Sequence, residues 1–119
     1  MADRIEVRGI RAVGYHGVLD FERVEGQEFS VDVALTVDTA AAAASDDLTL
    51  TVDYSAIAQM AYQHITGEPH QLIETLAHRL ADDVLRVPGV LGVTVSVHKP
   101  SAPIPVSFDD VVVTVHKGE

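Results

Sequence analysis

The stretch FSVDVALTVD, residues 29–38, carries the clearest structural pattern in this chain of 119 residues. Its odd-numbered positions are apolar, and its even-numbered positions are small or polar. Successive side chains of a β-strand point to opposite faces of the sheet, so this alternation predicts a strand with one buried face. The apolar positions are Phe29, Val31, Val33, Leu35 and Val37. Such a strand is typical of an antiparallel sheet that packs on one side only.

Three further segments show the same period of two. Residues 5–8 alternate apolar and charged side chains until Gly9 interrupts, and the apolar position then shifts to Ile10. A change of parity at a glycine indicates a β-bulge or a bend. Near the C-terminus, residues 91–99 (LGVTVSVHK) and 111–117 (VVVTVHK) alternate in the same way, with a proline-rich turn between them. We therefore expect four strands.

Two helices are expected between the second and the third strand. Asp53 is a suitable N-cap for a helix over residues 54–66, which Gly67 ends. Its expected inward stripe consists of Tyr54, Ile57, Ala58, Ala61 and Ile65. A second helix is expected over residues 71–86, with an inward stripe of Ile73, Leu76, Ala77, Leu80 and Val84. The alanine-rich segment 39–44 could form a helical turn, and its composition does not decide this.

The order of these elements is strand, strand, helix, helix, strand, strand. Grouped strands with grouped helices favour an α+β fold, here a four-stranded antiparallel sheet with two helices on one face in ββααββ order. The segment YHGVLDFERVEGQ, residues 15–27, is expected to be a loop. We see no repeat and no linker, so residues 1–119 are expected to form a single domain.

Composition and charge restrict the class of protein. The chain has 8 basic and 18 acidic residues and a formal net charge of −10, which argues against binding to nucleic acid or to an anionic membrane. It has no cysteine, and its N-terminal residues are charged, so we expect a cytoplasmic protein without disulfides. A mean hydropathy of +0.18 is high for so small a domain. We therefore expect other copies of the chain to cover part of its surface.

Lys99 stands out because its charge contradicts its position. It continues the apolar parity of residues 91–97, so its side chain is expected to leave the sheet on the apolar face. Desolvation disfavours a charged amine, and desolvated lysines commonly carry protons in catalysis. Taken singly, Glu22, Tyr54 and Glu74 have simpler explanations: a solvated loop acid, a packing tyrosine, and a carboxylate that complements a helix dipole.

Metal and nucleotide chemistry are not indicated. The six histidines show neither an H-x-H nor an H-E-x-x-H spacing, so we expect no metal site. No serine lies in a nucleophile elbow, and no glycine-rich loop resembles a phosphate-binding loop.

Together, these residues resemble the bacterial dihydroneopterin aldolase family. The matching pieces follow the family's order and spacing: YHGV (15–18) with Glu22, SDDL (45–48) leading to TVDYSAI (51–57), LIETLA (72–77) and VHKPSAPI (97–104). The resemblance implies the tunnelling fold, in which subunits join their sheets into a ring tetramer and two rings stack as an octamer. It also implies that each active site lies between neighbouring subunits.

The family's reaction is the retro-aldol cleavage of 7,8-dihydroneopterin. It releases glycolaldehyde and 6-hydroxymethyl-7,8-dihydropterin, a precursor of folate. The N5=C6 imine of the substrate takes up the electrons, so the resemblance implies neither a metal nor another cofactor. By this resemblance Lys99 shuttles protons, Tyr54 of the adjacent subunit relays a proton or holds the substrate hydroxyls, and Glu22 positions water or the ammonium group.

The resemblance also assigns the residues that bind the pterin. Glu74 matches the family's glutamate, whose two oxygens accept hydrogen bonds from the 2-amino group and N3. Ile73 matches a position that contributes through its backbone. The remaining residues implied for the pocket are Glu22, Val52, Asp53 and Tyr54. His16 and Gly17 belong to the same motif, and we expect them to shape the loop.

Other functions on the same scaffold remain open at this point. An epimerase would invert the 2′ carbon of dihydroneopterin, or of its triphosphate, through the same cleaved intermediate. An oxygen-consuming side reaction of that intermediate is a further possibility. A non-catalytic pterin-binding oligomer would need Glu74 but neither Lys99 nor Tyr54.

Overall fold

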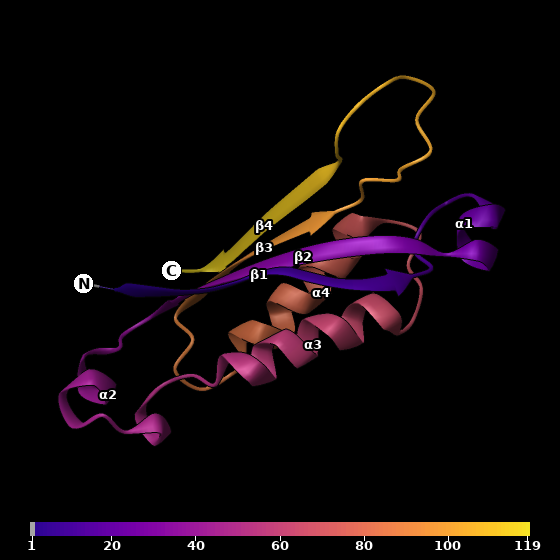
Figure 1. Cartoon of the computed structure of the whole chain (residues 1–119). Helices are drawn as coiled ribbons and strands as arrows, with labels where there is room; N and C mark the ends of the chain where they lie inside the picture. The colour runs from indigo at the N-terminus through magenta and orange to yellow at the C-terminus, as the bar shows by residue number, and fades with distance from the viewer. Residues whose placement is uncertain (1) are drawn as a thin grey trace.

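The structure is a computed structural model that describes residues 2–119. Its elements in chain order are β1 (Asp3–Gly14), α1 (Asp20–Glu25), β2 (Gln27–Val37), α2 (Ala40–Ser45), the 3-10 helix η1 (Leu48–Leu50), α3 (Tyr54–Thr66), α4 (Ile73–Leu85), β3 (Gly92–His98) and β4 (Val112–Gly118). The four strands form one antiparallel sheet in the order β1-β2-β3-β4. The two long helices, α3 and α4, lie together on one face of it (Figure 1). The α+β fold expected from the sequence is confirmed.

Strand β2 carries the centre of the hydrophobic core. All five apolar residues of its alternating pattern are at most 2% exposed, as that pattern predicts. Val33 lies opposite Val95 of β3, and Leu35 lies opposite Val93, so the two central strands present one continuous apolar face to the helices. Burying a side chain of this size contributes roughly 1.5–3 kcal/mol relative to leaving it exposed.

Strand β1 contains the irregularity expected at Gly9. The register against β2 shifts between Val7 and Ile10, and Gly9 has a φ of +70°, which a residue with a Cβ adopts only at a cost. The Gly9 amide donates a hydrogen bond of 2.8 Å to Oδ1 of Asp32. The bulge therefore replaces a regular ladder bond with a bond to a side chain of the neighbouring strand.

Helices α3 and α4 bury the stripes expected for them, except that Ala58 of α3 is only half-buried and Tyr54 is exposed. Ile57, Ala61 and Ile65 of α3 are buried, and the Asp53 side chain caps the helix by accepting a 2.9 Å hydrogen bond from the Ser55 amide. Tyr54 was expected in the inward stripe, and this prediction is wrong, because the side chain is 63% exposed at the first turn. The buried residues of α4 are Ile73, Leu76, Ala77, Leu80, Ala81 and Val84. In the described part of the chain, no helix is both long and apolar enough to cross a membrane.

Two short helices occur where the sequence indicated a loop or gave no decision. Helix α2 forms in the alanine-rich segment and ends at Asp46, whose φ of +53° is left-handed. Helix α1 lies inside the expected loop 15–27, so that part of the prediction is wrong. Its Glu22 side chain accepts a hydrogen bond from the Leu19 amide at the start of the helix. Glu22 also pairs with Lys99, which is 77 positions away in the sequence, and local sequence patterns do not report such a contact.

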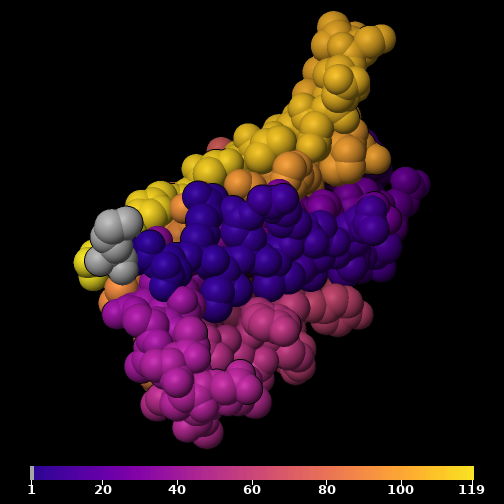
Figure 2. All heavy atoms as spheres, turned by 60° about the vertical axis from the view of Figure 1, so that its left-hand side comes forward, coloured from indigo at the N-terminus to yellow at the C-terminus, as the bar shows by residue number. Residues whose placement is uncertain are grey.

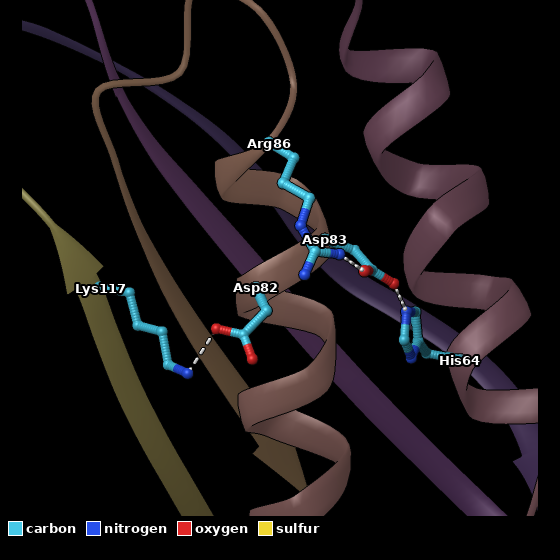
Figure 3. A network of polar contacts seen from close by, with 5 residues as sticks. All are labelled: His64, Asp82, Asp83, Arg86 and Lys117. Carbon is cyan, nitrogen blue, oxygen red and sulfur yellow. Dashed lines mark hydrogen bonds and ion pairs between the residues drawn. The ribbon is translucent and has the colours of Figure 1, made fainter.

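Polar contacts fix α4 to its neighbours on both sides (Figure 3). Asp83 pairs with His64 of α3 at 2.7 Å and with Arg86 at 2.9 Å. The adjacent Asp82 pairs with Lys117 of β4 at 2.5 Å. These contacts lie near the surface, so they fix the orientation of α4 more than they stabilise the fold.

Candidate active site

A cavity of about 350 Å³ lies where α1, the N-terminus of α4 and the segment 99–111 meet. Its walls include four of the residues that the sequence singled out: Glu22, Ile73, Glu74 and Lys99. Much of the remaining wall is apolar and comes from Val18, Leu19, Leu72, Ile104, Val111 and Val113. A mostly apolar pocket with a few converging polar groups is the usual form of a small-molecule site.

Lys99 reaches this cavity from the end of β3. Its backbone amide donates a 2.8 Å hydrogen bond to the carbonyl of Val111, and Pro100 then prevents the strand from continuing. The side chain is only 12% exposed and lies on the apolar side of the sheet, as the alternation predicts. Its Nζ lies 2.6 Å from Oε2 of Glu22.

Glu22 is the carboxylate of this pair and is 3% exposed. Besides Lys99, it accepts hydrogen bonds from Nε2 of Gln27 at 3.0 Å and from the Leu19 amide at 3.3 Å. Burial by itself would raise the pKa of Glu22, but the hydrogen bonds from Lys99, Leu19 and Gln27 outweigh burial and lower it below the ordinary value. The site therefore holds a charged carboxylate that fixes the position of the lysine ammonium group.

Gly17 makes room for this carboxylate. A Cβ added at Gly17 would lie 2.5 Å from both carboxylate oxygens of Glu22, far inside van der Waals contact. Its φ of +154° also disfavours a residue with a side chain. The Gly17 amide donates a 2.9 Å hydrogen bond to the carbonyl of His70, which fixes the loop against the connection between α3 and α4.

His16 anchors the same loop from inside the protein. The side chain is fully buried, its Nδ1 accepts a 3.0 Å hydrogen bond from the His70 amide, and its Nε2 lies 2.8 Å from the carbonyl of Ile65. These partners require a neutral ring with its proton on Nε2. Burial is the main reason why the pKa of His16 is lowered. The geometry agrees with the loop-shaping role expected for His16.

Helix α4 presents Ile73 and Glu74 to the cavity at its first turn. Ile73 is almost completely buried, because it begins the stripe that packs against the sheet. The unpaired amides of a helix N-terminus carry partial positive charge, which stabilises a carboxylate there. Glu74 is therefore placed at the cavity wall without a cost to the helix.

The other three predicted residues do not meet this cavity within one chain. Val52 lies instead in a separate hollow with Val37, while Asp53 caps α3 and Tyr54 is exposed. Val37 ends β2, whereas Gln27, which contacts Glu22, begins it. Ten residue steps along a strand span about 33 Å. Figure 1 shows the same separation, with α1 at one end of the sheet and α2, which precedes this segment, at the other.

Gln27 is a polar residue of this site that the sequence reasoning missed. Its Nε2 donates to Glu22, and its Oε1 is buried without a hydrogen-bond partner among the described residues. Gln27 shares the parity of Phe29 and therefore continues the apolar face of β2. A polar residue on an apolar face was the signal that identified Lys99, and it could have identified Gln27 as well. Within residues 2–119, no three His, Asp or Glu side chains are grouped to hold a metal ion.

The sheet with its helix layer is the architecture of the tunnelling fold, the class of enzyme that the sequence resemblance implies. The solved structure of Escherichia coli dihydroneopterin aldolase in complex with neopterin superposes with a TM-score of 0.89 at 26% identity, covering 98% of this chain and 99% of that one. A Burkholderia dihydroneopterin aldolase bound to guanine superposes with a TM-score of 0.82 at 29% identity, covering 99% of this chain and 92% of that one.

Sequence comparison identifies the family. The family model described as FolB, dihydroneopterin aldolase, matches residues 5–116. The dihydroneopterin aldolase of Streptomyces coelicolor is 51% identical over 113 residues, which are 95% of each chain. The chain belongs to the dihydroneopterin aldolase family, and the resemblance stated from the sequence is confirmed.

Proposed function

We propose that this protein cleaves 7,8-dihydroneopterin into 6-hydroxymethyl-7,8-dihydropterin and glycolaldehyde. The observation that carries the proposal is the shared cavity: the buried Lys99–Glu22 pair and the helix carboxylate Glu74 line one pocket. Glu74 provides the acceptor for the pterin ring, and the pair provides a proton carrier beside its side chain. Membership of the family supports this assignment of substrate and reaction.

Glu74 binds the edge of the pterin that carries the 2-amino group and the N3 hydrogen. Its two oxygens accept one hydrogen bond from each group, as a carboxylate does with a guanidinium. The apolar walls contributed by Leu72, Val111 and Val113 contact the faces of the ring. Two solved relatives were crystallised with neopterin and with guanine, whose rings share this donor edge.

The reaction requires only proton transfers, because the substrate contains its own electron sink. Removal of the proton from the 2′-hydroxyl makes the aldehyde of glycolaldehyde as the bond between C1′ and C2′ breaks. The electrons of this bond pass through C1′ and C6 to N5, which gains a proton. A proton then moves to C1′ and N5 gives up its own, which yields the hydroxymethyl product. Re-addition of glycolaldehyde to the other face would give the 2′ epimer as an accompanying product.

Lys99 serves in this mechanism as the proton carrier. Its ammonium group is held by Glu22 and shielded from bulk water, so its position is set before the substrate arrives. Tyr54 is proposed to reach the cavity of a neighbouring subunit, together with Val52 and Asp53, and to hold or relay the proton of the substrate hydroxyls. The separation of these residues from Lys99 within one chain supports this division.

We propose that the protein works as a ring tetramer, with two rings stacked as an octamer. Strands β1 and β4 form the two edges of the sheet. An edge strand has unpaired backbone N–H and C=O groups, and the edge strand of another subunit can pair with them. Both ends of the sheet also carry exposed apolar side chains: Val18, Phe21 and Val24 at one end and Leu48, Leu50 and Tyr54 at the other. Contacts between these two ends would complete each cavity and remove the apolar surface from water.

A product assay with 7,8-dihydroneopterin tests the proposal. The protein should release glycolaldehyde and hydroxymethyl-dihydropterin, with a smaller amount of the 2′ epimer. A Lys99→Ala variant should keep pterin binding and lose turnover by orders of magnitude, whereas Glu74→Ala should lose binding. Epimer as the main product would indicate an epimerase instead. Binding without any turnover by the unaltered protein would indicate a non-catalytic pterin-binding oligomer.

A further inference from the structure

His98 lies directly before Lys99 and points to the opposite face of the sheet. Its Nε2 lies 2.7 Å from Oδ2 of Asp32 on β2, and its Nδ1 lies 2.7 Å from Oδ2 of Asp110. Asp110 belongs to the segment 99–111, which connects β3 to β4. The ring therefore joins the middle of the sheet to the end of this segment.

Only the doubly protonated ring satisfies both contacts. A neutral imidazole has one N–H donor, so one of the two carboxylates would face a lone pair of the ring. Burial by itself would lower the pKa of His98, but the hydrogen bonds to Asp110 and Asp32 outweigh burial and raise it above the ordinary value. The ring is therefore protonated below this raised pKa, and one of the two bonds is lost as the pH rises through it.

The charged groups around His98 form a short chain across the sheet. The other oxygen of Asp32 accepts the amide of Gly9 at the β1 bulge, so this carboxylate is fixed from its far side. Burial by itself would raise the pKa of Asp32, but the hydrogen bonds from Gly9 and His98 outweigh burial and lower it, and the charge of Arg8 on β1 adds a smaller effect in the same direction. Asp110 contacts the ring from the side of β4. These contacts thus link β1, β2 and β3 to the end of the segment 99–111.

This cluster lies next to the backbone that positions the proton carrier. Asp110 precedes Val111, whose carbonyl accepts the 2.8 Å hydrogen bond from the Lys99 amide. The side chains of Lys99 and Val111 both line the cavity. The segment between them stands out from the body of the molecule, as Figure 2 shows, so its two ends depend on local contacts for their position.

We propose that His98, bridging Asp32 and Asp110, is a positioning residue that holds the Lys99 backbone and the Val111 wall of the cavity in register. The inference rests on the proposed function, because it assigns to His98 the placement of the group that moves protons. His98 does not contact the cavity. It acts through the backbone of its neighbour and through Asp110, which joins the segment to the sheet.

The first test follows the bridge itself. With ¹³C-labelled histidine in the full-length protein, the ring signal of His98, assigned by its absence in His98→Gln, should titrate above pH 6.5, the ordinary midpoint for histidine. Asp110→Asn should move this midpoint down. The hydrogen-exchange protection of the Lys99 amide should be lower in His98→Gln and in Asp110→Asn than in the unaltered protein. In the unaltered protein this protection should fall as the pH rises through the His98 midpoint.

The second test follows the reaction. His98→Gln and Asp110→Asn should lower turnover by about tenfold to a hundredfold, since small misplacements of a catalytic group have effects of this size. His98→Arg keeps a positive charge with several donors, so it should retain most of the turnover. In this variant the protection of the Lys99 amide should no longer fall at the pH of the His98 midpoint. His116→Gln is the matched control, because His116 lies on the same sheet face and bonds to Thr94 instead. It should change turnover by less than about twofold.

The inference is wrong if His98→Gln and Asp110→Asn match His116→Gln in both turnover and Lys99 amide protection. It is also wrong if the His98 midpoint is ordinary and insensitive to Asp110→Asn. A failure of the proposed function looks different: the unaltered protein would not cleave dihydroneopterin. The titration of His98 and the protection of the Lys99 amide would still show whether His98 bridges Asp32 and Asp110 and holds the Lys99 backbone.

Discussion

A Gly17→Ala substitution should destabilise the protein far more than its size suggests. The new methyl group would lie 2.5 Å from both carboxylate oxygens of Glu22. Lys99, Gln27 and the Leu19 amide all hold that carboxylate, so moving it away breaks at least one of these contacts. To accommodate the methyl group, the protein must either displace the loop or separate the Lys99–Glu22 pair. Separating a buried pair costs about 3–5 kcal/mol.

Gly9→Ala provides the control for this prediction. Gly9 also has a positive φ, of +70°, but no atom lies within 4 Å of an added Cβ. Its substitution should therefore cost only the backbone strain, about 1–2 kcal/mol. Urea unfolding at one protein concentration should show Gly17→Ala to be less stable than Gly9→Ala by about 3 kcal/mol or more, with turnover strongly reduced. A difference below about 1 kcal/mol would refute the proposed coupling between Gly17 and the ion pair.

Two further predictions concern the fold. The pKa of His16 is lowered mainly by burial, so the unfolded chain binds this proton more readily. The contribution of His16 to stability should therefore be constant above about pH 6.5 and should fall as the pH drops toward the lowered pKa. His16→Gln should reduce this loss between pH 7 and 5 in urea unfolding, and an unchanged slope would contradict the assignment. Leu35→Ala should lower the free energy of unfolding by about 2–5 kcal/mol, because Leu35 is fully buried in β2. The exposed Val106 in the segment 99–111 is the control: Val106→Ala should stay within about 0.5 kcal/mol, and equal losses at both positions would contradict the core described above.

The fold was largely predictable because its strongest signals are local. The alternation around Val33 and the stripe of α4 each depend on side-chain spacings within one element, and the structure buries both as expected. Gly9 indicated the bulge, and the parity of Lys99 indicated the face on which its side chain lies. Tyr54 shows the limit of this reasoning: its spacing fits the inward stripe, but it lies in the first turn and is exposed.

The sequence by itself determined the order of the four strands and the two long helices, most of their buried faces and, through the family motifs, the identity of the family. Only the tertiary structure decided that Glu22 is buried in a short helix against Lys99, that Gln27 contacts it, and that His98 bridges two carboxylates. The reason is the range of the interactions. Hydrophobic periodicity is a pattern of a few successive residues, so it can be read from the sequence. Polar partners come from distant segments, as in the bond between His16 and the His70 amide, 54 positions apart. Such partners are known only once the chain has folded.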